Sequence, residues 1–450
     1  MNKTIFSTSG LRGIVNQDLY PELIAEISAG FGTLVGGGKV AVGRDCRTSG
    51  EMLFAAVVSG LLSAGCEVIN LGICPTPTVL LNVKQLGFAG GIVITASHNP
   101  EDWNGLKFVS KEGTFLNEDE LKEFKGLLKK RNFKRANWSE IKIVKDEPEA
   151  ITNHIKTVLR SDYFKDIPVK KFVVGIDTCN GAAGVVVNSL LQSLGLTPVH
   201  FFYNTEKPGY FPRKPEPTAE NLTNFANFVK EKHLDFGIAF DPDGDRVSFV
   251  DETGFALGEE ATICLALLFI LKRKVGPVVV NLSTTMAVFD IANRFSAPVF
   301  TTKVGESAVV TKMKEVNAII GGEGNGGVIL PEINFTRDGI TATAILIHLL
   351  SDREKPLSEI RREIPRYYIQ KTTLPYQSKT WANKKIALKK AFGLARFDAA
   401  DGLKVIGKDY WVHIRPSNTE PVLRIIAETN TPESTTNLIA KVKEILKPNT

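Results

Sequence analysis

Three aspartates at alternate positions form a cluster that could bind a metal ion. Asp241, Asp243 and Asp245 lie in the segment DPDGDR, whose proline and glycine indicate a turn. Carboxylates at this spacing can point inward together, and clustered hard oxygen ligands suit Mg²⁺ or Ca²⁺. Aspartate-rich turns also occur as plain solvated loops. The sequence therefore leaves a metal site and a polar surface turn as alternatives.

Two other kinds of site share features with this segment. A calcium loop of the EF-hand type needs glycine at its sixth position and helices on both sides, whereas the sixth position here is Arg246 and the flanks FGIAF and VSFV predict strands. Phosphatases of the haloacid-dehalogenase type place a nucleophilic aspartate in a DxDG segment after a strand. The third carboxylate, Asp245, favours a metal site instead, and a metal-dependent sugar-phosphate phosphatase stays a remote alternative.

The second candidate for chemistry is Ser97, in the segment TASHNP. A GxSxG elbow is absent and no Ser-His-Asp set is evident, while the adjacent His98 cannot easily present its ring to the same hydroxyl as a base. Ser97 could instead carry a phosphoryl group and donate it, with metal and cations neutralising the charge. We expect the segment to lead into a helix whose N-terminus stabilises phosphate. A serine that only caps a helix is the alternative.

Two further polar loops contain groups that suit a sugar phosphate. Residues 321–327, GGEGNGG, combine a backbone that a ligand can approach closely with Glu323 and Asn325, which suit sugar hydroxyls. No Gly-Lys-Ser/Thr follows, so this is not a Walker loop. The segment HIRPSNTEP gathers a guanidinium, two hydroxyls and an amide suited to a phosphate dianion, on Arg415, Ser417, Asn418 and Thr419. A polar hairpin loop is its alternative.

A weak internal repeat must position these loops. Each copy opens with a strand that feeds a helix, at residues 39–42, 172–176 and 278–280. Each copy closes with a second strand that ends in a polar loop, and these strands are predicted at residues 92–94, 236–240 and 318–320. Ligands collect at the carboxyl ends of strands in open α/β sheets, so the three loops are expected to meet.

The pattern changes after residue 368. Strands are predicted at residues 403–408, 410–414 and 422–426, and a terminal helix at 433–446. The predicted fold class is therefore α/β, with three similar mixed α/β domains and a smaller C-terminal α+β domain. Charged segments near 138–150 and 363–371 interrupt the repeat. They place the domains at residues 1–147, 148–250, 251–367 and 368–450.

Composition restricts the class of function. The chain has 450 residues, of which 43% are hydrophobic and 23% charged, as in folded globular proteins. Its net charge of +6 is spread along the sequence, which suits small anionic substrates better than nucleic acid. Five cysteines without a CxxC pair, and no apolar signal segment, indicate a cytoplasmic protein. The longest apolar run, residues 261–271, predicts a buried helix that is too short to cross a membrane.

Taken in order, the four loops resemble those of the α-D-phosphohexomutase family, from TSGLRG at Thr8 to RPSNTEP at Arg415. The resemblance implies four domains around a central cleft and an intramolecular phosphotransferase of the isomerase class. Such an enzyme moves phosphate between C6 and C1 of a hexose through a hexose 1,6-bisphosphate. The resemblance also implies that Ser97 is the phosphoserine and that its phosphate and the three aspartates bind one Mg²⁺.

The resemblance further implies roles for other side chains. Arg12 and Lys107 match positions near the transferring phosphate and in proton handling, and His98 joins them as a catalytic candidate. For Lys107, a solvated strand lysine is the alternative. The residues expected to bind substrate are Arg246, Lys303, Glu323 and Asn325, with Arg415, Ser417, Asn418 and Thr419 holding the non-reacting phosphate.

One departure from the family bears on the substrate. Many bacterial members read GExSGH in the sugar-binding loop, whereas this chain has Asn325 for the serine and Gly327 for the histidine. The proton transfer assigned to that histidine in some members cannot be carried over. The loop is most similar to phosphoglucosamine mutases and archaeal-type mutases, which favours conversion of glucosamine 6-phosphate to glucosamine 1-phosphate. Glucose and mannose phosphates are the alternative substrates, and a monomer or homodimer is expected.

Overall fold

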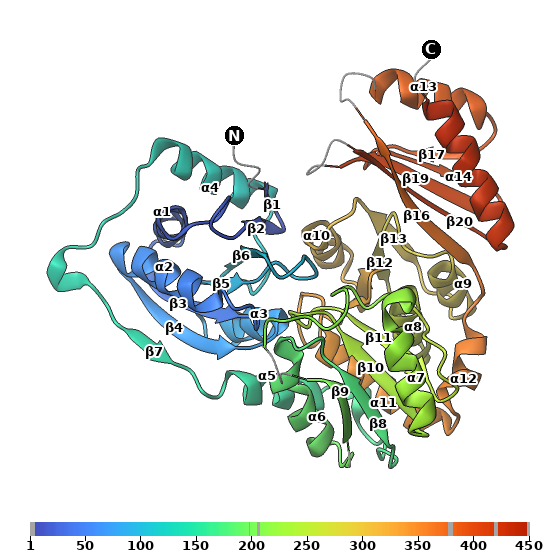
Figure 1. Ribbon diagram of the computed structural model, residues 1–450, viewed down its shortest axis with the longest axis horizontal. Coiled ribbons are helices and arrows are strands. Elements are labelled where there is room, and N and C mark those ends of the chain that lie inside the picture. Colours follow the sequence, from blue (N-terminus) through green and yellow to red (C-terminus); the bar gives the residue numbers. More distant parts are fainter. Residues whose placement is uncertain (1–4, 198, 205–207, 377–380, 418–421, 448–450) are drawn as a thin grey trace.

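Four β-sheets follow one another along the chain (Figure 1). The computed structural model describes residues 5–197, 199–204, 208–376, 381–417 and 422–447. The first three sheets combine parallel and antiparallel pairs and are covered by helices, whereas the fourth is antiparallel throughout. We call the parts built on these sheets the first, second, third and fourth units. The predicted fold class is confirmed.

The first unit contains a seven-stranded sheet in the order β1-β2-β6-β5-β3-β4-β7. Its strands are β1 Ile5–Ser7, β2 Gly10–Ile14, β3 Gly38–Arg44, β4 Cys66–Ile73, β5 Gly90–Ile94, β6 Trp103–Ser110 and β7 Val144–Asp146. Its helices are α1 Pro21–Leu34, α2 Gly50–Ser63, α3 Thr76–Gln85 and α4 Glu118–Lys130. Asn117 starts α4 with a capping box, which satisfies backbone N–H groups of the first turn. The rings of Phe31, Phe108 and Phe124 pack together in its core.

The second and third units each contain a four-stranded sheet, in the orders β11-β10-β8-β9 and β13-β12-β14-β15. The elements of the second unit are α5 Ala150–Leu159, β8 Val174–Asp177, α6 Val187–Ser193, β9 Val199–Tyr203, α7 Thr223–Glu231, β10 Phe236–Phe240 and β11 Val247–Asp251. Those of the third are α8 Glu260–Arg273, β12 Val278–Asn281, α9 Ala287–Arg294, β13 Val299–Thr302, α10 Glu306–Val316, β14 Ile320–Glu323, β15 Gly327–Ile329, α11 Gly339–Arg353 and α12 Leu357–Ile360.

One hydrophobic core runs through both of these units. It joins Phe236 and Ile238 of β10 to α8 and α11, whose side chains are buried over most of their length. The buried helix predicted at residues 261–271 is thus confirmed as the centre of α8. Among the described residues, no helix is both long enough and apolar enough to span a membrane. All five cysteines are buried and free.

The internal repeat is present in the strand pairing. The opening and closing strands of each copy are parallel neighbours, as β3 and β5, β8 and β10, and β12 and β14. Each closing strand then pairs antiparallel with the next strand along the chain, β6, β11 or β15. Each polar loop therefore connects two antiparallel neighbours. We call residues 95–102 the serine loop, 241–246 the metal loop and 321–327 the sugar loop.

The structure contradicts two predictions of local secondary structure. The serine loop does not lead into a helix, because residues 103–110 form β6, which fills the place between β2 and β5. The strand predicted at residues 318–320 is shifted, because β14 begins at Ile320 and ends at Glu323. Three residues of the sugar loop, Gly321, Gly322 and Glu323, thus pair directly with β15.

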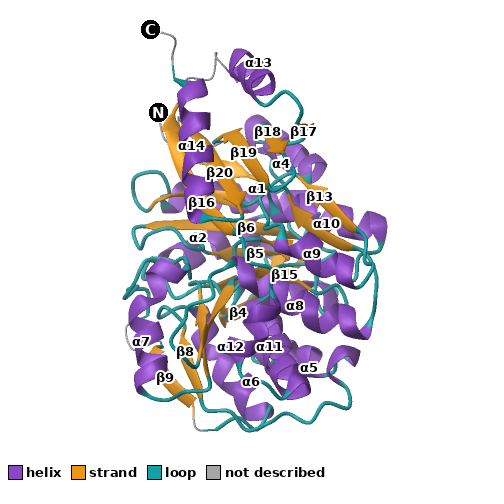
Figure 2. Cartoon of the chain, turned by 90° about the vertical axis from the view of Figure 1, so that its right-hand side faces the viewer, coloured by secondary structure: helices purple, strands orange, loops and turns teal. Residues whose placement is uncertain are grey.

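The fourth unit contains a five-stranded sheet in the order β16-β20-β19-β18-β17. Its elements are β16 Tyr368–Pro375, α13 Trp381–Ala391, β17 Arg396–Asp398, β18 Leu403–Ile406, β19 Tyr410–Pro416, β20 Val422–Thr429 and α14 Pro432–Leu446. The last helix lies along this sheet (Figure 2) and buries Ile439 and Val442 in a separate small core. The strand and helix predictions after residue 368 are confirmed, with β18 shorter than expected because it ends at Ile406, and β19 and β20 longer.

Polar contacts join the fourth unit to the third. Glu428 accepts hydrogen bonds from the Met286 backbone (2.7 Å), from the Thr285 hydroxyl just before α9, and from Trp411 Nε1 (2.6 Å). Lys404 donates to the Leu282 carbonyl oxygen at 2.6 Å and lies over the Trp411 ring. Burial lowers the pKa of Lys404 to about 8, although the Glu428 charge opposes this shift. The interface thus contains a buried lysine that loses its proton easily.

This lysine should make stability depend on pH. Below pH 8 the lysine is protonated in both the folded and unfolded states. Between pH 8 and the ordinary value of 10.5 the unfolded chain binds more protons, so the free energy of unfolding should rise with pH. Relative to Lys404→Met, the wild type should gain about 3 kcal/mol across this window. Urea unfolding of both proteins at pH 7.5 and 10.5 measures the change, and a constant difference between them would contradict the assignment.

Candidate active site

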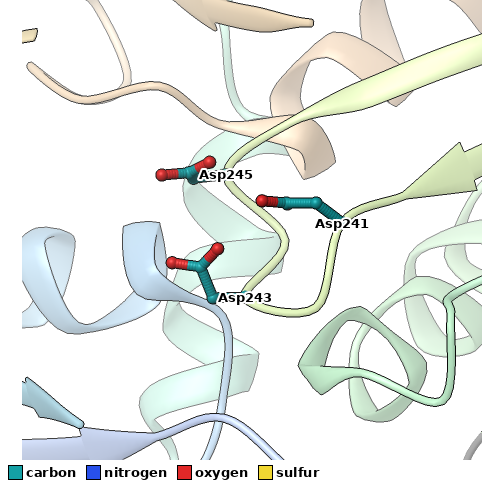
Figure 3. Close-up of side chains that lie close together, drawn as sticks. All are labelled: Asp241, Asp243 and Asp245. Atoms are coloured by element: carbon teal, nitrogen blue, oxygen red, sulfur yellow. The ribbon is translucent and has the colours of Figure 1, made fainter. Parts of the chain in front are cut away.

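The metal loop places three carboxyl groups side by side. Asp241, Asp243 and Asp245 are fully buried, and each offers an oxygen within 4.8 Å of the others. Figure 3 shows the three side chains on the loop between β10 and β11, with their carboxyl groups close together. Gly244 has a φ of +67° and its N–H donates to the Asp241 carbonyl oxygen, which makes the tight turn possible. Strands on both sides exclude an EF-hand, as expected from the sequence.

The hydrogen bonds to Asp243 and Asp245 involve only one oxygen of each carboxylate, and the other oxygen could bind a cation. Asp243 Oδ2 accepts from Thr76 and from Lys107, each at 2.6 Å. Asp245 Oδ2 accepts from Lys107 at 3.2 Å and from Arg337 at 2.7 Å. Within the described part of the chain, Oδ1 of Asp243 and Oδ1 of Asp245 are buried without a hydrogen-bond partner. Buried oxygens without partners are costly unless a ligand satisfies them, and a hard divalent cation fits this donor set.

The electrostatics of the cluster agree with a cation site. Burial raises the pKa of Asp241 well above its ordinary value, and the charges of Asp243 and Asp245 raise it further. For Asp243, burial is outweighed by the charge of Lys107 and by hydrogen bonds from Lys107 and Thr76, so its pKa is lowered. The three carboxyl groups therefore repel one another when they are ionised, and a bound divalent cation would relieve that repulsion.

Ser97 lies against the metal loop. Its side chain is fully buried, and its Oγ donates to Asp241 Oδ2 at 3.1 Å. The residue has a left-handed backbone, with a φ of +51°, and its N–H donates to the Thr95 hydroxyl at 2.8 Å. The structure thus brings the predicted serine and the predicted acids together. Since β6 follows the loop, charge on a phosphate here would be neutralised by nearby cations rather than by a helix N-terminus.

His98 is closer to the serine than the sequence indicates. Its Nδ1 lies 3.4 Å from Ser97 Oγ, a long hydrogen-bonding distance. The expectation that the ring cannot face this hydroxyl is wrong, because the left-handed backbone at Ser97 turns the chain sharply enough to bring the two side chains together. The charge of Arg246, burial and the charge of Arg12 lower the pKa of His98 well below its ordinary value. The imidazole is therefore neutral near pH 7.

A buried arginine holds the serine loop in this conformation. Arg47 donates to the Ser97 and Asn99 carbonyl oxygens at 2.7 Å, to that of Trp103 at 2.9 Å, and to that of Pro100. Its Nε pairs with Asp45 at 3.1 Å, and Asp45 also accepts from the Thr95 hydroxyl. One guanidinium therefore satisfies three backbone acceptors of the irregular serine loop and one at the start of β6.

Replacing this arginine should loosen the loop without removing charge. An Arg47→Lys variant keeps the cation but can satisfy fewer of the four carbonyl groups, so Ser97 should be held less accurately. We expect kcat for isomerisation to fall about 10- to 100-fold while the KM for sugar phosphate changes little. Steady-state kinetics measure both, and Arg135→Lys at the surface is the control. An unchanged kcat would show that the loop keeps its shape without Arg47.

Cations surround the acids and the serine. Lys107 is buried, so the alternative of a solvated strand lysine is wrong; burial is outweighed by the charges of Asp243 and Asp245, which raise its pKa. Arg246 donates through its backbone to Asp241 at 3.1 Å and through its side chain to Glu216 at 2.8 Å. Arg12 donates to Asn99 of the serine loop at 3.0 Å, and burial lowers its pKa to about 10.

The acidic residue of the sugar loop is occupied within the protein. Glu323 Oε1 accepts from the Asn281 side chain at 2.8 Å and from the Gly305 backbone at 3.1 Å. Its Oε2 accepts from Arg337 at 3.0 Å and from Asn325 at 3.3 Å. Glu323 and Asn325 are therefore neighbours, as the sequence predicts, and the arginine links them to the metal loop.

The remaining predicted residues lie on the third and fourth units. Lys303 follows β13, is partly exposed and pairs with Glu118 of the first unit. Arg415 is on β19, 4.0 Å from Asp401; burial lowers its pKa, and the charges of Asp401 and Glu323 oppose this. The Ser417 N–H donates to the Val422 carbonyl oxygen. Asn418 and Thr419 lie outside the described residues.

Four domain models of one family match the chain in order. They are described as phosphoglucomutase/phosphomannomutase alpha/beta/alpha domains I, II and III and C-terminal domain, and they match residues 3–135, 150–254, 259–368 and 377–445. The chain belongs to the α-D-phosphohexomutase family. As a phosphohexomutase it is an isomerase that moves a phosphate group within a hexose phosphate.

Relatives of this phosphohexomutase extend over nearly its full length. A phosphoglucomutase/phosphomannomutase of Thermococcus kodakarensis is 38% identical over 441 residues, which are 95% of each chain. A probable phosphoglucosamine mutase of Pyrococcus abyssi is 35% identical and covers 98% of this chain and 97% of its own. Among solved structures, a phosphoglucomutase/phosphomannomutase family protein from Burkholderia thailandensis superposes with a TM-score of 0.84 at 25% identity, covering 98% of each chain. These relatives give no support to the phosphatase alternative.

Sequence reasoning missed four residues that shape the site of this phosphohexomutase. Asp45 and Arg47 follow the strand predicted at residues 39–42, in a segment for which the sequence predicts only a connection to a helix. Thr76 and Arg337 precede or begin helices and carry no motif of their own. Position gives a signal for three of them, because Asp45, Arg47 and Thr76 follow the carboxyl ends of the parallel strands β3 and β4, whereas Arg337 has no such signal.

Proposed function

We propose that the enzyme interconverts glucosamine 6-phosphate and glucosamine 1-phosphate through a phosphorylated Ser97 and a hexose bisphosphate. The observation that carries the serine's role is the 3.1 Å contact of Ser97 Oγ with Asp241, inside a buried cluster of acids and cations. The sugar loop GEGNGG and the phosphoglucosamine mutases among the relatives support glucosamine as the substrate. Glucose or mannose phosphate is the second candidate, favoured by the Thermococcus relative with 38% identity.

The proposed cycle uses two phosphoryl transfers. In the first, a sugar hydroxyl oxygen bonds to phosphorus as the bond from phosphorus to Ser97 Oγ breaks, and Ser97 Oγ gains a proton in place of the one that the sugar hydroxyl loses. The bisphosphate then turns over in the site and returns its other phosphoryl group to Ser97. Lys107 is the proposed proton-handling residue, with His98 beside the serine. Arg12 and Arg246 would neutralise charge on the transferring group.

Asp243 and Asp245 would hold Mg²⁺ through their Oδ1 atoms, which lack hydrogen-bond partners, and Asp241 would hold it through Oδ2, which accepts from Ser97. The ion would supply charge neutralisation and orientation for the phosphoryl group when bound. Thr76, Lys107 and Arg337 fix the other oxygens of Asp243 and Asp245, so the carboxylates are oriented before an ion enters. A hexose 1,6-bisphosphate would act as activator by restoring the phosphate on the serine.

Substrate recognition would come from the third and fourth units. Glu323 and Asn325 would contact sugar hydroxyls, Lys303 would lie on the ligand side, and Arg415, Ser417, Asn418 and Thr419 would hold the non-reacting phosphate. We propose that the four domains comprise residues 1–147, 148–250, 251–367 and 368–450. We further propose that the four domains surround a central cleft and that the enzyme works in the cytoplasm as a monomer or homodimer.

A comparison of substrates tests the proposal. Purified enzyme with Mg²⁺ and a trace of glucose 1,6-bisphosphate is given the 1-phosphates of glucosamine, glucose, mannose and N-acetylglucosamine in separate assays. We expect kcat/KM to be highest for glucosamine by about 10-fold or more, since a buried polar group that recognises the amine would penalise its absence. Equal values would contradict a glucosamine-specific enzyme. Release of free phosphate without isomerised sugar would contradict a mutase altogether.

A further inference from the structure

Arg337 bridges three carboxylates that belong to different parts of the site. It lies just before α11 and is 7% exposed. Its Nε pairs with Glu306 at 2.9 Å, one terminal nitrogen with Glu323 at 3.0 Å, and the other with Asp245 at 2.7 Å. A single guanidinium thus connects the sugar loop, the metal loop and the first residue of α10. The planar fork of arginine suits such a set of bonds, whereas a lysine ammonium does not.

Gly327 makes this arrangement possible. A Cβ atom at position 327 would lie 2.2 Å from Arg337 Cδ and 2.7 Å from its Cγ, which are distances that atoms do not tolerate. Any side chain at 327 and the observed position of Arg337 therefore exclude each other. This is the place where many bacterial members of the family have histidine. The arginine stem occupies the space next to the glycine, and its charged end reaches both loops.

The surroundings of Arg337 fix it firmly. The next residue, Asp338, accepts the backbone N–H groups at the start of α11 and pairs with His154 of the second unit at 2.8 Å. His154 also contacts the Thr78 hydroxyl of the first unit at 2.9 Å. Asn334, three residues earlier, donates to the Pro77 carbonyl oxygen. The arginine thus projects from a segment anchored to the first and second units.

We propose that Arg337 is a positioning residue that couples the sugar loop to the metal loop, and that Gly327 is required to make room for it. By holding Asp245 Oδ2, it leaves Oδ1 without a hydrogen-bond partner and 3.7 Å from Arg246 Nε; by holding Glu323 Oε2, it ties the sugar loop to the same guanidinium. The inference rests on the proposed function for its catalytic consequence. Its effect on metal binding does not depend on which sugar is used.

Two substitutions at different positions should give the same defect. Arg337→Lys keeps the charge but loses the fork, and Gly327→Ala keeps the arginine but displaces it. Mn²⁺ binding is measured in the absence of sugar phosphate. The electron paramagnetic resonance signal gives the concentration of unbound Mn²⁺, from which the dissociation constant follows. We expect each variant to raise the Mn²⁺ dissociation constant at least 5-fold and to lower kcat/KM about 100-fold. Because the charge is unchanged in both variants, weaker binding would report lost geometry.

The double variant and two controls separate positioning from general damage. Gly327→Ala and Arg337→Lys both disrupt the contacts of the Arg337 guanidinium with its carboxylates. The Mn²⁺ dissociation constant of the double variant should therefore be at most about twofold higher than that of the single variant that binds more weakly. Gly126→Ala in α4, where a Cβ meets no atom within 4 Å, and Arg353→Lys at the far end of α11 should match the wild type. Thermal midpoints of all variants should stay within a few degrees of the wild type.

The outcomes are decisive in either direction. Mn²⁺ dissociation constants within twofold of the wild type in both single variants would overturn the inference, as would fully additive losses in the double variant. A wild-type protein that binds no Mn²⁺ would also overturn it. If the wild type isomerises none of the sugar phosphates while both variants still lose Mn²⁺ binding, the proposed function fails and the positioning role of Arg337 stands.

Discussion

A Ser97→Ala variant is expected to lose isomerase activity by at least about 10³-fold, because the group that carries phosphate between the two positions of the sugar is gone. The fold should be retained. Ser97 Oγ contacts only Asp241 at 3.1 Å and His98 at 3.4 Å among the described residues, and the left-handed loop is held mainly by Arg47 and Thr95. Thermal unfolding should therefore change little while turnover disappears.

Mass spectrometry of the intact protein checks the same residue directly. Wild-type enzyme incubated with glucose 1,6-bisphosphate should gain the mass of one phosphoryl group, and Ser97→Ala should gain none. Ser193→Ala, on the exposed side of α6, is the matched control and should behave as the wild type. A phosphorylated Ser97→Ala protein, or one that isomerises normally, would remove Ser97 from the mechanism.

An Asp243→Asn variant is expected to lose at least about 10³-fold in kcat, since it removes a candidate metal ligand and the strongest partner of Lys107. Its effect on stability should be small because two changes oppose each other. Lys107 loses its 2.6 Å ion pair, but the repulsion that raises the pKa of Asp241 is relieved. Calorimetry should show a thermal midpoint within a few degrees of the wild type.

The metal dependence of this variant separates it from a folding defect. Activity of the wild type should disappear with a chelator and return with Mg²⁺. Asp243→Asn should stay inactive at every Mg²⁺ concentration at which the sugar phosphate remains dissolved. Asp409→Asn, an exposed residue of the fourth unit, provides the control for the substitution itself. Full activity of Asp243→Asn in saturating Mg²⁺ would mean that this carboxylate is not needed for the ion or for Lys107.

Much of the fold could be predicted because local patterns and tertiary packing agree. The strand at residues 236–240 is apolar throughout and is buried on both faces, so its sequence alone identifies it. The acids that follow it are adjacent in sequence and share one turn. Their convergence with Ser97 could also be predicted, because each loop follows the closing strand of its own sheet, at the end where ligands collect in open α/β sheets.

The errors occurred where distant partners decide local structure. Residues 103–110 contain glycine and lysine and are not among the strands that the repeat predicts, yet they form β6, which pairs with β2 on one side and β5 on the other. The orientation of His98 depends on the positive φ of Ser97, which the sequence does not announce. Arg47 donates to the Ser97 carbonyl oxygen, 50 positions away, and Arg337 donates to Asp245, 92 positions away, and no motif marks such contacts.

The common core of the second and third units has a consequence for the modularity of the chain. Side chains of β10, α8 and α11 pack in one continuous interior, so neither unit has a complete core of its own. The fourth unit, in contrast, encloses a separate core and meets the third through polar side chains such as Glu428. In an exchange of segments between related chains, the middle two units would have to be transferred together, whereas the last could be grafted by itself.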